Sequence, residues 1–231
     1  MGLKIKSPST LYLGSLTKPS ISNASGLTVH SLSTVYLGSA VDPESGGETK
    51  TLNLVSVGGA TYDEDYIFTK TPSDILDMYF ETPNDIFSSI NATSDDEVEI
   101  KLKIKFTNSY NAPIGTDRNY GFGLYVNSTY KIGLVLQGVI PNTKDISANQ
   151  WYWFKITKRK EGISTYFSFL YSENGIDYTY ITNNEDRSNV GNNNKLIFGK
   201  GTSTGTVYGF QGSIDFKECD IIINGQSVLW I

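Results

Sequence analysis

Cysteine and histidine are almost absent from the sequence. It contains a single cysteine, Cys219, and a single histidine, His30, among 231 residues. One cysteine cannot form a disulfide within the chain, so disulfides play no part in holding the fold together. A catalytic cysteine would need a histidine partner, and His30 lies far from Cys219 in a Ser/Thr-rich stretch. We therefore expect Cys219 to be a small buried hydrophobic residue.

Long apolar runs and an excess of positive charge are also missing. No apolar run approaches the roughly 18 residues of a membrane-spanning helix, and residues 1–15 lack the apolar core of a secretory signal. The net charge of -5 argues against nucleic acid and against a membrane as partners. The densest basic run, at residues 155–160, is expected to form a solvated turn between two strands.

Alternation of apolar and polar residues is the main structural signal. In residues 97–106 every second residue is apolar and the residues between are Glu or Lys. This period of two predicts a strand with one face on a core and the other in water. Further strands are expected over residues 50–57, 77–81, 120–126, 130–136, 151–157, 163–171, 178–182, 195–198, 210–217 and 220–223. Helical periodicity is not sustained anywhere, so the sequence predicts an all-β, antiparallel two-sheet sandwich or jelly roll.

Glycine-containing turn signals separate these strands. Asn174-Gly175 and Asn224-Gly225 carry the dipeptide favoured in type I′ hairpin turns. Residues 199–202, Gly-Lys-Gly-Thr, weakly resemble a phosphate-binding loop but lack its full spacing and the helix that follows it. We expect them to form a loop between strands.

The first sixty residues contain an internal repeat. Residues 9–15, Ser-Thr-Leu-Tyr-Leu-Gly-Ser, return at residues 33–39 as Ser-Thr-Val-Tyr-Leu-Gly-Ser, a period of 24 residues. The pattern predicts a strand and a turn repeated twice, although chance similarity within a Ser/Thr-rich arm is an alternative. Two such units bury little surface alone. We therefore expect residues 1–59 to form an anchoring and oligomerisation arm that acts through Leu11, Tyr12, Leu13, Val35, Tyr36 and Leu37, with a second domain at residues 60–231.

Two ordered motifs after residue 60 resemble a known family. Gln-Trp-Tyr-Trp-Phe-Lys-Ile at residues 150–156 precedes Gly162, residues 167–172, Gly175 and Tyr178, and Phe-Gln-Gly-Ser-Ile-Asp-Phe follows at residues 210–216. Together they are similar to concanavalin A-like lectin/glucanase and laminin-G domains. The last segment and the repeated Tyr-Leu-Gly-Ser strings resemble segments of phage tail and fibre proteins. The resemblance implies a concanavalin-like jelly roll and a phage virion structural protein, of the head or tail fibre or decoration type.

Sugar binding requires exposed aromatic faces and planar polar groups. The residues expected to supply them are Arg118, Asn119, Tyr120, Trp151, Trp153, Asn174 and Tyr178. Trp151 and Trp153 share one strand face while Tyr152 and Phe154 share the other. Because both faces are bulky, the alternative interpretation is that a second packed layer or a subunit covers the two tryptophans.

Catalytic and metal chemistry have weaker support. Glucanases of this fold place carboxylates two residues apart on one strand, and Glu97 with Glu99 has that spacing, but the next position is Lys101. Alternating charge on a solvated strand face explains Glu97 and Glu99. A second acidic run, Asp63-Glu64-Asp65, is expected to lie in a loop. We therefore expect that the chain is not an enzyme. No dedicated metal or cofactor motif is present, and a structural Ca²⁺ held by Asp95, Asp96, Asp117 or Asp145 is left open.

The leading hypothesis is therefore a phage virion structural protein, and it implies three kinds of partner. These are other capsid or tail proteins, two further copies in a homotrimer, and a glycan of the host surface. A carbohydrate-binding adhesin outside any virion is the first alternative, and a glycoside hydrolase is the second.

Overall fold

The computed structural model describes four short strands before residue 50, then residues 53–71, 76–83, 86–116, 121–191, 193–203 and 206–229. The chain divides into two compact units, Met1–Lys50 and Thr51–Ile231. The strand β5 (Val55–Val57) pairs with β7 (Tyr79–Glu81) of the second unit. The division thus falls a few residues before Gly59, where the sequence suggested a boundary.

In the first unit, strands 24 residues apart pair with each other in parallel. β1 (Leu3–Ile5) pairs with β3 (Leu27–Val29), and Leu3 lies opposite Leu27. β2 (Thr10–Tyr12) pairs with β4 (Thr34–Tyr36), and Tyr12 lies opposite Tyr36. The expected strands at the two copies of the repeat are present, and the repeat stacks on itself in register. Leu13 and Leu37 lie outside the described residues. The role of the repeat in anchoring and oligomerisation stays a prediction.

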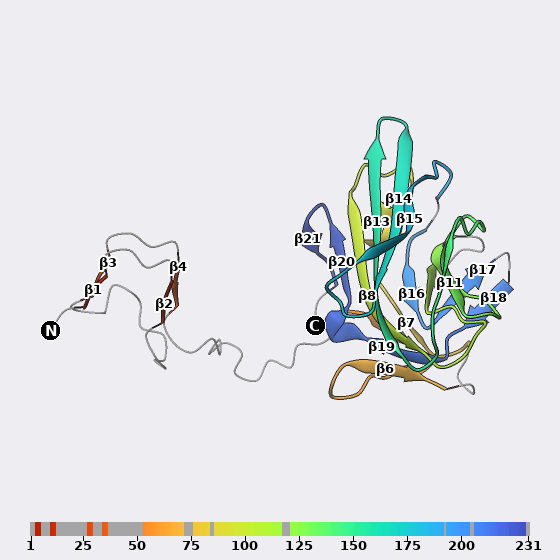
Figure 1. The fold of residues 1–231 in the computed structure, drawn as a ribbon, viewed down its shortest axis with the longest axis horizontal. Coiled ribbons are helices and arrows are strands. Elements are labelled where there is room, and N and C mark those ends of the chain that lie inside the picture. The colour runs from red at the N-terminus through yellow and green to blue at the C-terminus, as the bar shows by residue number, and fades with distance from the viewer. Residues whose placement is uncertain are drawn as a thin grey trace. The chain divides into compact units, whose positions relative to one another are not determined.

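The second unit contains a large antiparallel sheet of eight strands (Figure 1). Its main path runs in the order β15 (Thr179–Asp186), β14 (Ser164–Ser172), β13 (Trp151–Glu161), β8 (Val98–Phe106), β19 (Gly212–Asp215) and β6 (Ile67–Lys70). The hairpin of β20 (Asp220–Ile223) and β21 (Gln226–Ser227) pairs with the first half of β8. β8 thus has β13 along one edge and two different strands along the other.

A second layer faces this sheet. One part has the order β5, β7, β16 (Leu196–Phe198), β9 (Ile114–Thr116), and the other has the order β10 (Phe122–Val126), β11 (Lys131–Leu136), β12 (Thr143–Asp145). β9 and β10 contact each other, and a hairpin of β17 (Lys200–Ser203) and β18 (Thr206–Gly209) contacts both. Short 3-10 helices occupy Ile86–Ile90 and Phe216–Glu218. The prediction of an all-β, antiparallel two-sheet jelly-roll sandwich is confirmed.

Aromatic and branched side chains from both layers fill the space between them. In β8 the residues Val98, Ile100, Leu102, Ile104 and Phe106 are buried and the residues between them are not, as the alternation predicted. Phe216 lies at the centre of a phenylalanine cluster, with ring centroids 5.4 Å from Phe80, 5.4 Å from Phe198 and 6.2 Å from Phe68. Cys219 is buried as expected.

Three local predictions were wrong. Residues 200–203 form the strand β17 rather than a loop, because they pair with β18. The turn at Asn224-Gly225 has the two positive φ angles of a type I′ turn, but at Asn174-Gly175 only Gly175 has one. Lys158 in the basic run is buried, because β13 continues to Glu161 and its alternation carries Lys158 to the core face.

The long strand β13 thus places one set of side chains in the core and another on the outside of the large sheet. Among the residues that the structure describes, no helix is both long and apolar enough to cross a membrane.

Candidate functional site

The side of the large sheet that points away from the core carries most of the candidate binding residues, and we call it the outer face. Trp151, Trp153 and Lys155 of β13 alternate with buried residues and are half-buried on this face. The antiparallel register places Trp151 opposite Lys105 and Trp153 opposite Lys103 of β8. Since side chains directly opposite one another in antiparallel strands are close, two indole rings and two ammonium groups meet there.

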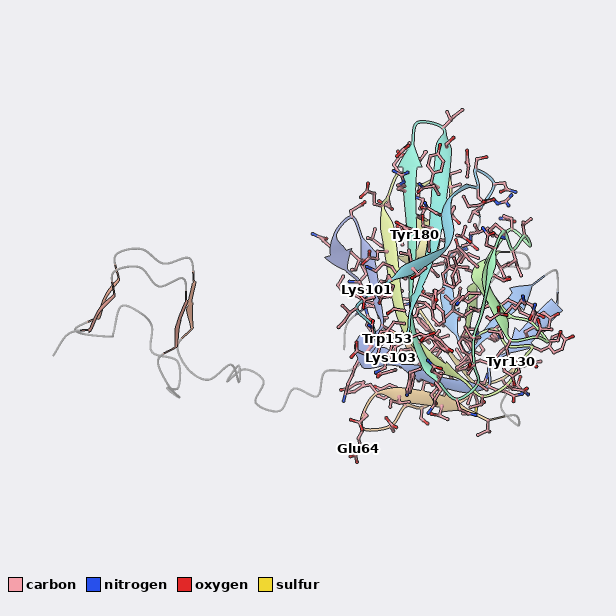
Figure 2. The ribbon with its side chains drawn as sticks, in the orientation of Figure 1. Glu64, Lys101, Lys103, Tyr130, Trp153 and Tyr180 are labelled. Carbon is pink, nitrogen blue, oxygen red and sulfur yellow. The ribbon has the colours of Figure 1, made fainter. Side chains whose placement is uncertain are left out.

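Lys103 is the centre of this group. Its Nζ lies 5.1 Å from the ring centroid of Trp153 and 5.3 Å from that of Trp151, and it forms an ion pair of 2.8 Å with Asp215 Oδ2. Lys105 Nζ lies 5.0 Å from the Trp151 ring. Figure 2 shows Trp153 and Lys103 together on the large sheet, with Tyr180 farther along it. The ring faces of the two tryptophans are therefore engaged by cations of the same chain.

The turn between β14 and β15 folds against Trp153. A Cβ atom added to Gly175 would lie 3.0 Å from both Nε1 and Cε2 of the Trp153 indole, a tighter contact than most Cβ atoms make, and Gly175 has a φ of 76° that favours glycine. Asn174 holds the turn, since its Oδ1 accepts hydrogen bonds from the Ile176 and Asp177 N–H groups and its Nδ2 donates to Asp177 Oδ2 at 2.9 Å. The layer that covers Trp153 is thus supplied in part by the chain's own turn, and the polar groups of Asn174 act within it.

Two tyrosines extend the outer face beyond this turn. Lys155 Nζ lies 5.0 Å from the ring centroid of Tyr178. Burial raises the pKa of Tyr178, and the carboxylates of Glu99 and Glu218 raise it further, so the phenol stays protonated. Tyr180 of β15 lies opposite Leu170 and is 56% exposed, which leaves its ring accessible to a ligand.

A groove of about 360 Å³ opens at the far end of the outer face, next to the β20–β21 hairpin. Its lining includes Glu97, Glu99, Thr157, Arg159, Ile222 and Gly225. Glu99 forms ion pairs of 3.2 Å with Lys101 and 3.7 Å with Lys155. The groove therefore combines carboxylate, guanidinium and hydroxyl groups with one apolar wall.

Arg159 is held at the mouth of the groove by its neighbours. Its guanidinium pairs with Glu161, donates to Asn184 Oδ1 at 3.3 Å, and lies 5.3 Å from the ring of Tyr166. A planar guanidinium placed in this way offers paired donors to hydroxyl or carboxylate oxygens.

One of the residues that line the groove is a buried lysine. Lys158 is 1% exposed, and its Nζ donates to the carbonyl oxygens of Ser89, Ser94 and Asp96 at 3.0, 2.6 and 2.8 Å. Burial lowers the pKa of Lys158, while Asp96 opposes that change. All three donors of the ammonium are used, which fixes residues 89–96 against β13.

The structure brings together Trp151, Trp153, Asn174 and Tyr178 among the residues that the sequence suggested for sugar binding. Arg118, Asn119 and Tyr120 lie outside the described residues. Sequence reasoning missed Lys103, Asp215, Gly175 and Arg159 as members of the same face. Alternation within β8 and β13 places Lys103 and Arg159 outward, but only the strand pairing shows which residues they meet.

Residues considered for catalysis or for a metal site have other partners. Glu99 pairs with lysines as described above, and Asp96 accepts hydrogen bonds from Ser89, Ser94 and Asn224. Cys219 donates to the Asp215 carbonyl oxygen at 3.2 Å, and burial raises the pKa of its thiol to about 12. In the described part of the chain, no three His, Cys, Asp or Glu side chains gather where they could hold a metal ion. The possible Ca²⁺ site stays a prediction.

No protein-family model matches this chain, and no curated protein matches it. Several solved structures are similar. A heptameric SAP-like pentraxin from Limulus polyphemus is 14% identical with a TM-score of 0.37, over 55% of this chain and 63% of the pentraxin. Domains LG4-5 of the mouse laminin alpha1 chain are 14% identical with a TM-score of 0.44, over 65% of this chain and 40% of that one.

The binding domain of botulinum neurotoxin DC, solved with rat synaptotagmin II, is 14% identical with a TM-score of 0.41, over 74% of this chain and 43% of the toxin chain. The chain spans less than two thirds of the length of each of these structures. By its own architecture, the second unit is a jelly-roll β-sandwich that presents an aromatic and charged sheet face.

Proposed function

We propose that this chain is a glycan-binding structural protein of a phage virion, and that its second unit binds the glycan on the outer face. The observation that carries the proposal is the groove of about 360 Å³ lined by Glu99, Thr157 and Arg159, on the same face as the exposed ring of Tyr180. Planar polar groups can satisfy sugar hydroxyls in pairs, while aromatic rings cover the apolar CH face of a pyranose. A glycan of the host surface is the proposed ligand.

The first unit is proposed to anchor the chain and to hold a homotrimer together. Its two parallel pairs have strands of only three residues each, and isolated two-stranded pairs are marginally stable in water. Further strands, from other copies or from capsid or tail proteins, would stabilise them. This need for partner strands, together with the resemblance of the repeated Tyr-Leu-Gly-Ser strings to phage tail and fibre proteins, is the support for a head or tail fibre or decoration protein located in the virion, over a free-standing adhesin module.

Glycan binding is tested with a glycan array followed by calorimetric titration of the best ligand. The variants Arg159→Ala and Tyr180→Ala should each weaken binding at least tenfold, because they remove the groove's guanidinium and the accessible ring. Val139→Ala is a matched control, since Val139 is exposed but lies in the second layer, after β11. The absence of binding to any glycan at millimolar concentration, with the oligomer confirmed, would refute glycan binding.

The assembly part is tested separately by light scattering. The intact chain should show about three times its monomer mass of 25.5 kDa at micromolar concentration. Val35→Pro removes a backbone N–H within β4 and should lower the measured mass without changing the fold of the second unit. A monomeric mass for the intact chain would contradict the homotrimer.

The glycoside hydrolase alternative makes a different prediction. If Glu97 and Glu99 acted as an acid and a nucleophile, Glu97→Gln and Glu99→Gln would abolish hydrolysis of any bound glycan. If they are surface charges, as the ion pairs of Glu99 suggest, the intact protein should leave the bound glycan uncleaved.

A further inference from the structure

A second group of aromatic residues gathers away from the outer face, around Tyr110, Tyr125 and Tyr208, and we call it the tyrosine site. Tyr125 comes from β10, Tyr208 from β18, and Tyr110 from the loop between β8 and β9. We propose that the tyrosine site binds a neutral hexopyranose, such as a glucose, galactose or N-acetylhexosamine residue. This site is distinct from the groove, and its test does not require the groove to bind anything.

Tyr125 and Tyr208 form the base of the site. Their ring centroids lie 4.7 Å apart with an angle of 52° between the ring planes. Burial raises the pKa of Tyr125, and a hydrogen bond with Tyr208 and the nearby Tyr110 hydroxyl raise it further. The Tyr110 N–H also donates to the Asn127 carbonyl oxygen at 3.5 Å, directly after β10, so Tyr110 lies next to the strand that carries Tyr125.

Tyr110 is presented to solvent by a strained backbone. It is 58% exposed and has a φ of 51°, in the left-handed region that bulky residues rarely adopt. Such a conformation costs on the order of 1–3 kcal/mol and persists only where the surroundings impose it. An exposed aromatic ring held in a costly conformation contributes little to the core, which points to a role in binding.

The surroundings that impose this conformation are visible in Asn111. This side chain is buried, and its Nδ2 donates to the carbonyl oxygens of Asn108 and Gln211 at 3.1 and 2.8 Å. Its Oδ1 accepts from the Gln211 N–H at 3.0 Å, and its backbone exchanges hydrogen bonds with Val126. The loop is thus fixed to β10 and to the segment before β19, with Tyr110 pointing outward.

A pair of amide side chains lies close in the chain to Tyr110 and Tyr208. Asn108 Nδ2 donates to Gln211 Oε1 at 3.2 Å in an exposed pair, which leaves further donors and acceptors free to meet solvent or a ligand. The three tyrosines carry phenols, which are neutral at pH 7. The outer face, in contrast, carries Lys103 and Arg159 about 5 Å from its rings, and Lys103 is paired with Asp215. Phenol rings with amide groups fit an uncharged sugar.

The experiment is a saturation-transfer NMR titration of the intact chain with the methyl glycosides of glucose, galactose and N-acetylglucosamine, and with sialic acid as a charged probe. At least one neutral glycoside should receive saturation and bind in the millimolar range. Tyr110→Ala should weaken that binding at least tenfold, whereas Tyr110→Phe should retain most of it. Ile163→Ala is the control, since Ile163 is 94% exposed in the turn between β13 and β14, and it should leave this binding unchanged. Tyr180→Ala is measured beside it.

Tyr110→Gly separates binding from folding. Glycine adopts positive φ without strain, so this variant should unfold at the same or a higher temperature while it loses the sugar. No saturation of any neutral glycoside, or full binding by Tyr110→Ala, would overturn the tyrosine site. Loss on Tyr180→Ala but not on Tyr110→Ala would overturn it too and would place the sugar on the outer face, in support of the proposed function.

Discussion

The two units of this chain use opposite ways of pairing strands. In Met1–Lys50, every described pair is parallel and joins positions 24 residues apart, so that Leu3 meets Leu27 and Thr10 meets Thr34. In Thr51–Ile231, the strands pair antiparallel, often between distant positions such as Phe68 and Ile214. The first unit is ordered by repetition of a short sequence, and the second by convergence of unlike segments on one core.

This difference determines where each unit is vulnerable. A stack of repeats adds stability through each neighbouring repeat, so it depends on how many repeats are present. A sandwich core depends on single large side chains that many elements contact. Changes in the core should therefore act strongly and on the second unit alone. All three tryptophans lie after residue 150, so tryptophan fluorescence monitors that unit selectively.

The largest effect is expected for Phe216→Ala. Phe216 contacts Phe68, Phe80 and Phe198, so the substitution leaves a cavity at the centre of the core. The free energy of unfolding should fall by about 3–5 kcal/mol, measured by urea denaturation with tryptophan fluorescence. Tyr36→Ala in the first unit should leave this transition unchanged. An equal shift for both variants would show that the two units unfold together, so that core changes do not act on the second unit alone.

Lys158→Met should have the next largest effect. It keeps an aliphatic chain of similar length but leaves three backbone carbonyls without their donor. The expected loss is about 2–3 kcal/mol, with faster hydrogen exchange in residues 89–96. Lys155→Met on the outer face is the control and should cost about 0.5 kcal/mol or less. A similar cost for both lysines would mean that the buried carbonyls find water instead.

Gly175→Ala tests the contact between the turn and Trp153. Gly175 has a φ of 76° and Gly225 a φ of 79°, but only at Gly175 would a Cβ meet another side chain. Both alanine variants should therefore lose about 1 kcal/mol through backbone strain, and Gly175→Ala should lose about 1 kcal/mol more through overpacking. Its tryptophan emission should also shift. Identical results for the two variants would mean that the turn does not rest on Trp153.

The smallest effect is the pH dependence from Cys219. The pKa of its thiol is about 12 in the folded chain, above its ordinary value of 9.0. The unfolded chain therefore loses this proton first, so the contribution to stability is complete below pH 9 and is lost as the pH rises toward 12. At pH 9.5 the loss should be about 1 kcal/mol or less, and Cys219→Ala should remove this part of the pH profile. Rapid reaction of the native thiol with a disulfide reagent at pH 8 would contradict its burial.

Sequence patterns predicted the parts of the fold that depend on local alternation. The strand β8 could be identified because its five apolar residues recur with a period of two, and the Asn224-Gly225 turn because both residues tolerate positive φ. β17 was missed because Gly-rich residues 199–202 have no alternation, and pairing with β18 alone makes them a strand. Lys158 was misplaced because a lysine gives no sign that three carbonyls will surround it.

The candidate site, too, was predictable from the sequence only in part. The sequence could indicate that Trp151 and Trp153 share a face, but not that Lys103 and Asp215 would meet them there, because β8, β13 and β19 come from distant segments. The sequence shows that tyrosines are abundant, but it does not show that Tyr110, Tyr125 and Tyr208 are neighbours in the folded chain.

Three properties follow from the sequence by itself. They are the all-β class, which comes from the alternation of apolar and polar residues, the 24-residue repeat of the first unit, and the absence of a disulfide within the chain. Only the tertiary structure decided which aromatic rings are covered and which are exposed. The physical reason is that alternation and turn propensity act between residues close in the chain, whereas strand order and register are fixed by burial of the whole core.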